Sequence, residues 1–186
     1  MGGMKAMPTP LHGLYEIGNT TVADARGRFS RLFCEQDFAS VRPELHFTQI
    51  NLSETKLQGT VRGMHYQTPP AAEAKLIRCL RGRVFDVAVD IRAGSATFLH
   101  WHAIELSADN DRAVFIPEGF AHGFQALTDD IQLLYLHTMP WTPTHEAGLR
   151  HDDPRLAIAW PQTVTLCSEK DRGYPLIDDR FTGVSL

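Results

Sequence analysis

The alternation of residue types across residues 83–91 places the strictest constraint on the fold. From position 85 onward an apolar residue stands at every second position, and two carboxylates, Asp86 and Asp90, lie between them. Side chains on a β-strand point to opposite faces in turn, so the pattern predicts a half-buried strand. Similar stretches rich in β-branched and aromatic residues recur at residues 27–33, 45–53, 59–67, 75–80, 98–106, 113–116 and 131–139.

This succession of short strands predicts an all-β protein. Turn residues separate the strands, as in Thr68-Pro69-Pro70 and Arg81-Gly82, and only residues 34–39 and 70–74 have a helical pattern. The spacing favours an antiparallel sandwich or barrel with short helices. Among these architectures the jelly roll pairs two β-sheets around an internal cavity, and it is the fold that we expect.

The length of 186 residues suits a single domain over residues 1–186. No segment repeats, and the first 140 residues contain no linker. After Pro140 the chain is punctuated by further prolines, which predicts a C-terminal wrap over residues 140–186. We expect residues 1–12 to form a flexible N-terminus.

Composition and charge exclude several classes of protein. With 18 Lys and Arg against 22 Asp and Glu, the formal net charge is -4, so the chain lacks the cationic surface that holds nucleic acid. No apolar run is long enough to span a bilayer, and the first residues lack the apolar core of a signal peptide. The three cysteines, Cys34, Cys79 and Cys167, form no paired motif, which favours a reducing compartment. We therefore expect a cytoplasmic protein that binds neither nucleic acid nor membrane.

Two predicted strands carry side chains that suit proton chemistry. The segment Arg62-Gly63-Met64-His65-Tyr66-Gln67 contains an imidazole that titrates near neutral pH, so His65 is either a general base or an ordinary satisfied histidine. In the stretch 75–80, alternation turns either Lys75 or Arg78 inward. An inward lysine could stabilise a developing enolate, whereas a lysine at a strand end could equally reach solvent.

Two further candidates lie near the predicted cavity. His122 stands in the segment 116–124, whose glycines and proline either shape a turn at the cavity mouth or only serve tight turns. Tyr135 shares a strand face with Leu133 and His137. It is either a core tyrosine or a proton donor.

A competing pattern suggests a metal site. His100, His102, Glu105 and His122 resemble the metal-binding motifs of cupins, in which three histidines and one glutamate hold a divalent ion. The spacing between His102 and Glu105 is shorter than in that motif, and Ala126 stands where an asparagine usually closes it. The metal-dependent reading is therefore the weaker alternative.

Taken in order, the motifs resemble the dTDP-4-dehydrorhamnose 3,5-epimerase family from about Gly13 to Pro175. The segments that carry the resemblance are Arg62-Gly63-Met64-His65-Tyr66-Gln67, Lys75-Leu76-Ile77-Arg78, residues 84–92, Leu106-Ser107-Ala108-Asp109-Asn110, residues 116–124 and Ser168-Glu169-Lys170-Asp171. Each motif alone is modest, but the ordered set is highly specific.

The resemblance implies a jelly-roll cupin fold and a homodimer that exchanges an N-terminal strand. It also implies an isomerase of carbohydrate biosynthesis that uses no metal or organic cofactor. The implied substrate is dTDP-4-dehydro-6-deoxy-D-glucose, a nucleotide sugar whose C4 ketone acidifies the protons on C3 and C5. Epimerisation at both carbons would give dTDP-4-dehydrorhamnose.

The resemblance also implies roles for individual residues. His65 would remove the protons, Asp171 would orient His65, Tyr135 would return protons from the opposite face, and Lys75 would stabilise the enolate. Arg62 and His122 would contact the sugar or the diphosphate. The residues implied on the nucleotide side are Arg26, Phe29, Gln49, Asn51, Glu146 and Lys170, with Trp141 where relatives often have a tyrosine near the base or sugar.

The chain departs from the family pattern at two more positions. Arg31 stands where the family commonly has a glutamate, and Leu136 replaces the usual lysine after Tyr135. Three alternatives to the 3,5-epimerase stay open from the sequence: a mono-epimerase at C3 or C5, a metal-dependent cupin, and a catalytically inactive protein that binds a sugar nucleotide.

Overall fold

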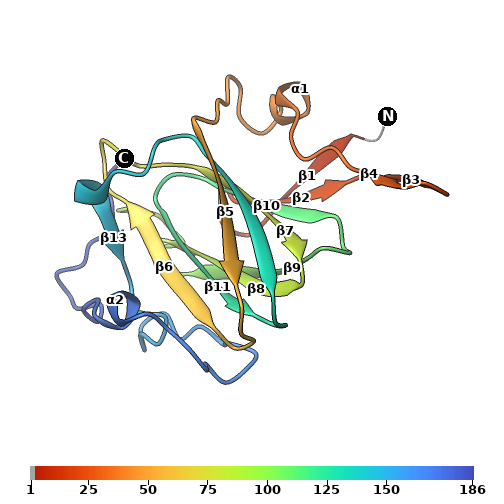
Figure 1. Ribbon diagram of the computed structural model, residues 1–186. Helices are drawn as coiled ribbons and strands as arrows, with labels where there is room; N and C mark the ends of the chain where they lie inside the picture. The colour runs from red at the N-terminus through yellow and green to blue at the C-terminus, as the bar shows by residue number, and fades with distance from the viewer. Residues whose placement is uncertain (1–2) are drawn as a thin grey trace.

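The computed structural model describes residues 3–186 and contains two antiparallel β-sheets packed face to face (Figure 1). The six-stranded sheet has the order β1 (Met4–Pro8), β2 (Tyr15–Asn19), β10 (Arg112–Ile116), β7 (Lys75–Arg81), β12 (Ile131–His137), β5 (Gln49–Thr55). The five-stranded sheet has the order β13 (Glu146–Gly148), β6 (Val61–Gln67), β11 (Phe120–Ala126), β8 (Arg83–Asp90), β9 (Trp101–Ser107). The predicted all-β jelly roll is thus confirmed.

Strand β8 lies inside its sheet between β11 and β9, and both of its faces are buried. The expectation of a half-buried strand is therefore wrong in one respect. The apolar face, with Val87 and Val89, packs under the C-terminal part of the chain, while Asp86 and Asp90 sit on the face toward the other sheet. Buried carboxylates need partners, and Asp90 receives hydrogen bonds from Arg92 and from the hydroxyls of residues 95 and 97.

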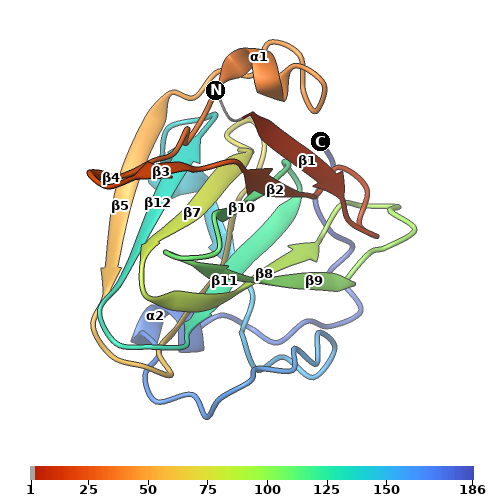
Figure 2. The ribbon, with the colours of Figure 1, turned by 90° about the vertical axis from the view of Figure 1, so that its right-hand side faces the viewer.

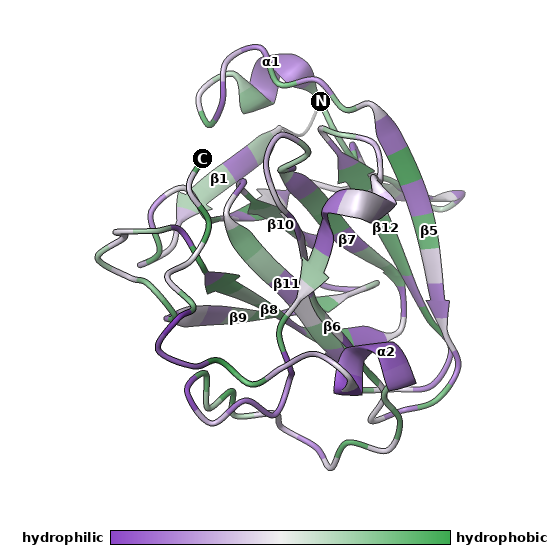
Figure 3. Ribbon diagram, turned by 90° about the vertical axis from the view of Figure 1, so that its left-hand side faces the viewer, coloured by the Kyte–Doolittle hydropathy of each residue, from purple (hydrophilic) through white to green (hydrophobic). Residues whose placement is uncertain are grey.

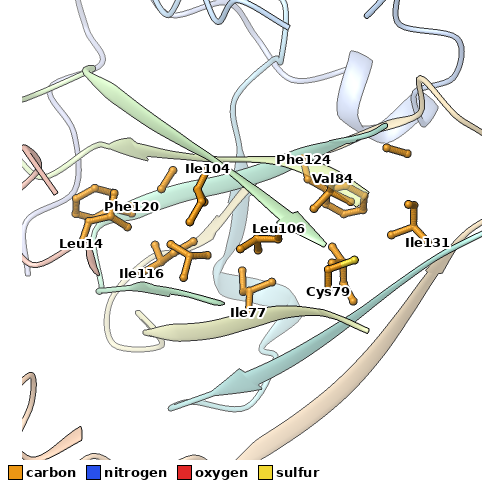
Figure 4. Packing of buried hydrophobic residues seen from close by; sticks show 14 of the residues in the cluster. Leu14, Ile77, Cys79, Val84, Ile104, Leu106, Ile116, Phe120, Phe124 and Ile131 are labelled. Atoms are coloured by element: carbon orange, nitrogen blue, oxygen red, sulfur yellow. The ribbon is translucent and has the colours of Figure 1, made fainter. Parts of the chain in front are cut away.

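The main core fills the space between the two sheets (Figure 4). Val84 and Phe124 come from the five-stranded sheet, and Ile77 and Ile116 face them from the six-stranded sheet. These side chains are almost fully excluded from water, and burying a side chain of this size contributes about 1.5–3 kcal/mol. The core therefore holds the two sheets at a fixed separation.

Each sheet also has a covered outer face. Residues of the C-terminal wrap, among them Leu149, Leu156 and Ile177, pack on the five-stranded sheet. Phe38, which belongs to helix α1 (Glu35–Phe38), packs with Leu76 and Leu136 on the six-stranded sheet. Apolar residues accordingly concentrate in the strands, whereas the second helix, α2 (Glu169–Arg172), is hydrophilic throughout (Figure 3). Within residues 3–186 no helix is long and apolar enough to cross a membrane.

Several local features differ from the expectations. Residues 70–74 form a turn and an irregular segment rather than a helix, because β7 begins at Lys75 and leaves room for little more than one helical turn. Residues 4–8, within the stretch expected to be flexible, form β1, and residues 1–2 lie outside the described residues. Strands β3 (Val22–Asp24) and β4 (Gly27–Phe29) form a hairpin that projects away from the sandwich (Figures 1 and 2).

A bulge in β6 sets the direction of two polar side chains. In the pairing with β11, His122 lies opposite His65 and Phe124 lies opposite Arg62, so β6 carries one extra residue between these pairs. Residues three apart on a regular strand face opposite sides, but the bulge turns Arg62 and His65 to the same side. Gly63 permits it: its φ is +120°, and a Cβ there would lie 2.5 Å from the Cα of Gly123.

Candidate active site

One end of the space between the sheets is a polar cavity of about 250 Å³. The five-stranded sheet contributes Arg62, His65, Tyr66, Gln67, His122, Phe124 and Glu146, and the six-stranded sheet contributes Asn51, Ser53, Lys75, Tyr135 and His137. Two loop residues, Glu73 and Trp141, complete the lining. Eight of the predicted site residues therefore share one cavity, and the two predicted acid–base groups among them, His65 and Tyr135, lie on opposing walls.

His65 is paired with a buried carboxylate. Its Nε2 lies 2.7 Å from Oδ1 of Asp171, and the other carboxylate oxygen accepts a hydrogen bond from the Gly63 amide at 3.2 Å. An ionised carboxylate only accepts, so Nε2 carries the proton and Nδ1 is the nitrogen with a lone pair. The pair thus fixes both the orientation and the tautomer of His65.

Helix α2 positions Asp171 beside strand β6. Its N-cap is Ser168, whose hydroxyl accepts a hydrogen bond from the Asp171 amide at 3.0 Å, and Asp171 is the buried residue of this helix. Burial raises the pKa of the Asp171 carboxyl, but the hydrogen bond and charge of His65, together with the Gly63 amide, lower that pKa by more. Asp171 is therefore ionised at neutral pH and can stabilise an imidazolium.

Lys75 faces the cavity, which resolves the choice between it and Arg78. Its Nζ lies 3.2 Å from Oε1 of Glu73, and the second oxygen of Glu73 lies 2.7 Å from Nδ1 of His137. Arg78 points to the outer face of the sheet, where it is also buried and binds Asp111 at 2.9 Å. A cation that touches the cavity is suited to stabilise negative charge that develops there.

Tyr135 lies between two histidines on the cavity wall. Its ring stacks on His137 with centroids 5.9 Å apart, and His122 approaches it edge-on at the same separation. His122 is held by Asp86 through a contact of 2.9 Å. Burial, and after it the nearby Asp86 charge, raise the pKa of the Tyr135 phenol well above its usual value. The phenol therefore keeps its proton at neutral pH and is able to donate it.

The rim of the cavity carries the remaining polar candidates. Trp141 is exposed, and its backbone amide donates to Oε1 of Gln49 at 3.1 Å. Glu146 lines the cavity and binds Nζ of Lys170 at 2.6 Å, a contact that raises the pKa of the lysine. Lys170 and Asp171 line a second cavity of about 400 Å³ that shares Arg62 and His65 with the first.

Two predicted site residues lie elsewhere in the chain. Arg26 and Phe29 belong to the projecting β3–β4 hairpin, where Arg26 pairs with Asp24 and the Phe29 side chain is highly exposed. Neither residue lines the cavity. Two of the residues that depart from the family pattern lie in different places. Leu136 packs under α1 on the outer face of the six-stranded sheet, whereas Trp141 lines the cavity.

The alternative metal set is not assembled. His102 binds Glu16 at 2.9 Å, and His122 binds Asp86 instead of joining the residues of β9. Across residues 3–186 no three His, Cys, Asp or Glu side chains are placed to hold a metal ion. His102 and His122 are therefore each held by a separate carboxylate, and Glu105 pairs with Arg83 at 3.7 Å.

Sequence reasoning did not select Glu73 or His137 as site residues. His137 had a usable signal, because it shares a strand face with Tyr135 two residues earlier. No sequence signal pointed to Glu73, since it lies in a segment that was expected to be helical. Ser53, Tyr66, Gln67 and Phe124 also line the cavity and belong to predicted strands or to motifs noted above.

The arrangement supplies every group that proton transfer beside a ketone requires. His65 on one wall can accept a proton, Tyr135 on the other wall can donate one, and Lys75 can stabilise an oxyanion between them. A base and an acid on opposing walls can act on opposite faces of a bound molecule. The geometry therefore suits inversion of a carbon centre.

Comparisons with known proteins agree with this chemistry. A family model described as dTDP-4-dehydrorhamnose 3,5-epimerase matches residues 8–179. The dTDP-4-dehydrorhamnose 3,5-epimerase of Sinorhizobium fredii is 44% identical over 153 residues, which cover 82% of this chain and 78% of the relative. The dTDP-4-dehydrorhamnose 3-epimerase of Streptomyces niveus is 40% identical over 176 residues, which cover 94% of this chain and 84% of the relative.

A solved structure is similar over nearly the full length. It is the dTDP-6-deoxy-D-glucose-3,5-epimerase from Legionella pneumophila in complex with dTDP-4-keto-L-rhamnose. The similarity has a TM-score of 0.89 at 37% identity and covers 97% of this chain and 98% of that chain.

Asp171→Asn is expected to switch the tautomer of His65. The Gly63 amide needs an acceptor, so the new side chain keeps its oxygen there and turns its NH2 group toward His65 Nε2. The proton then moves to Nδ1, and reactions that use Nδ1 as a base slow by roughly 10⁴-fold. Two-bond ¹⁵N–¹H NMR correlations of the imidazole report the tautomer. Asp152→Asn, at an exposed ion pair with Arg150, is the control, and an Nε2–H tautomer in Asp171→Asn would contradict the prediction.

Proposed function

The chain belongs to the dTDP-4-dehydrorhamnose 3,5-epimerase family, and from this premise we propose that it epimerises C3 and C5 of a dTDP-4-keto-6-deoxyhexose. The enzyme is an isomerase. The observation that carries the proposal is the cavity in which the His65–Asp171 pair faces Tyr135, with Lys75 on the same wall as the tyrosine. The same arrangement argues against a protein that only binds sugar nucleotides.

The proposed mechanism runs through an enolate. Nδ1 of His65 removes the proton from a carbon next to the C4 ketone. The electron pair of the broken C–H bond forms a C=C bond to C4, and the π electrons of the C4 carbonyl move onto its oxygen. The Lys75 ammonium stabilises that oxyanion. Tyr135 then donates its proton to the same carbon from the opposite face, which inverts the centre. The imidazolium loses its proton to solvent, and the phenolate recovers one.

This chemistry uses side chains of the protein alone. The C4 ketone of the substrate already acidifies the protons on its neighbouring carbons, so the reaction needs a base, an acid and an oxyanion partner. We therefore propose that no metal or organic cofactor takes part.

The residues at the rim support a site for the nucleotide diphosphate. Arg62 lies between the two cavities, and its guanidinium reaches across to β5, where it contacts Ser53 at 3.4 Å and the Glu54 carbonyl at 3.0 Å. Arg62 and Lys170 are suited to a diphosphate, and we assign His122, beside Tyr135, to the sugar. We assign the base to the region of Trp141, Gln49 and Asn51, because an exposed indole offers a stacking surface.

We also propose that the protein works as a homodimer in the cytoplasm. The outer face of edge strand β5 exposes Ile50 and Leu52, which are 64% and 56% accessible, and the projecting hairpin exposes Phe29 at 71%. A second copy covering these residues would let Arg26 and Phe29 reach the cavity of the partner. A reducing compartment suits the three cysteines, which are all free.

The reaction is tested by NMR of the substrate in deuterated water. With dTDP-4-keto-6-deoxyglucose, the parent should exchange deuterium at C3 and at C5, each followed as a separate signal. His65→Ala should lower both exchange rates by about 10² to 10⁴-fold, because a positioned base is lost. His46→Ala, an exposed histidine on the loop before β5, is the control. Near-normal exchange in His65→Ala would refute the assignment.

Tyr135→Phe should separate proton removal from inversion. The ring keeps its packing between the histidines, but the donor is lost, so the enolate is reprotonated by His65 from the original face. We expect continued deuterium exchange at C3 or C5 with little inverted product. Loss of one hydrogen-bonding group should change stability by about 1 kcal/mol. Tyr15→Phe on β2 serves as the control, and an inversion rate equal to the parent's would remove Tyr135 from the mechanism.

The dimer is tested by light scattering after size-exclusion chromatography. The parent should have the mass of two chains, and the double variant Ile50→Arg with Leu52→Arg should have the mass of one, because it places charges in the proposed apolar contact. Leu186→Arg, at another exposed leucine, should remain dimeric. A parent of single-chain mass at micromolar concentration would contradict the proposal.

A further inference from the structure

Besides His65–Asp171 and His122–Asp86, the site contains a third histidine–carboxylate pair, Glu73 with His137, which the proposed mechanism does not use. Glu73 lies two residues before the first residue of β7, and His137 ends β12. Their contact of 2.7 Å joins the two side chains across the pairing of these strands, where His137 lies opposite Lys75. The side chains of Glu73, Lys75 and His137 are 8%, 11% and 12% exposed, so all three groups are withdrawn from bulk water.

A carboxylate beside Lys75 needs an explanation. Taken alone, its negative charge would oppose the negative charge that develops on the substrate oxygen. However, a lysine side chain has a flexible four-carbon stem, and its ammonium is strongly hydrated. In a buried cavity without a counter-charge, such an ammonium would turn toward solvent. Glu73 therefore supplies both a counter-charge and a fixed direction, at 3.2 Å from Nζ.

His137 in turn holds Glu73. Its Nδ1–H donates to one carboxylate oxygen, which leaves the other oxygen for Lys75. Burial raises the pKa of Glu73, but the His137 hydrogen bond and the Lys75 charge lower that pKa by more, so the carboxyl stays ionised. The other ring nitrogen of His137, Nε2, lies 3.4 Å from the side-chain amide nitrogen of Asn51. The ring is thereby fixed from both sides.

We propose that Glu73 is a positioning residue of the reaction and that, braced by His137, it holds the Lys75 ammonium in place to stabilise the enolate oxygen. The inference rests on the proposed function. Glu73 does not itself bind the substrate. Its effect on the chemical step therefore depends entirely on Lys75.

Glu73→Gln keeps the shape of the side chain but removes its charge. Because the Lys75 interaction matters after proton removal, kcat should fall about 10- to 100-fold while KM changes less than about threefold. In a Lys75→Ala background the same substitution should cause less than about a twofold further loss, since there is no ammonium left to position. Independent, multiplicative losses would overturn the proposal.

Variants at His137 provide a second route if Glu73→Gln folds poorly. Asn at 137 can present an N–H near the position of Nδ1, whereas Val cannot. We expect His137→Asn to retain most of the parent kcat and His137→Val to lose about as much as Glu73→Gln. Equal kcat values in the two variants would contradict the role of His137. Glu105→Gln, at an exposed ion pair with Arg83, is the control for the charge change.

Two further measurements separate this inference from the proposed function. Binding of dTDP by calorimetry should be unchanged in Glu73→Gln, because the nucleotide has no keto oxygen to meet Lys75. A parent that exchanges no deuterium into the substrate would refute the proposed function. An active parent with an equally active Glu73→Gln variant would refute the positioning role alone.

Discussion

The pairing of each buried cavity carboxylate with a histidine is the interaction on which the site depends. The pairs are Asp171 with His65, Asp86 with His122 and Glu73 with His137. An unpaired ionised carboxylate in such an interior would cost several kcal/mol. The same hydrogen bonds also decide which ring nitrogen carries a proton. The interactions that make the polar interior tolerable therefore also prepare it for proton transfer.

The apolar part of the fold supplies the rigidity that these pairs require. His65 and Tyr135 belong to different sheets, so their separation is set by the packing of the side chains between the sheets. The bulge at Gly63 completes the arrangement, because it lets Arg62 and His65 leave β6 on the same side. Regular strands alone would not place both groups in the cavity.

The sequence predicts most strands, because alternation and β-branched residues are local signals. It does not predict which face of β8 points inward: the apolar face meets the C-terminal wrap, and Asp86 and Asp90 point between the sheets. Only the full chain decides this, since the wrap lies more than fifty residues further along. Alternation correctly indicates that His137 shares a strand face with Tyr135. The predicted site residue Phe29, by contrast, lies on a hairpin outside the cavity of its own chain.

The residues of the site could be predicted from the sequence mainly through the ordered set of motifs that resembles the family. His65 and Asp171 are 106 positions apart, and no local pattern links them. Resemblance to a family supplied that link, as well as the choice of Lys75. Glu73 could not be identified from the sequence, because its contact with His137 arises from the pairing of β7 with β12, a long-range contact that local propensity does not encode.

Phe124 belongs both to the core between the sheets and to the lining of the cavity. One side chain thus contributes to folding stability and to the shape of the cavity. Under mutation these two properties cannot drift independently at this position, because a smaller residue that widens the cavity also removes packing. Adaptation to a bulkier sugar through Phe124 would therefore require compensating substitutions in the core, which narrows the evolutionary routes open to the enzyme.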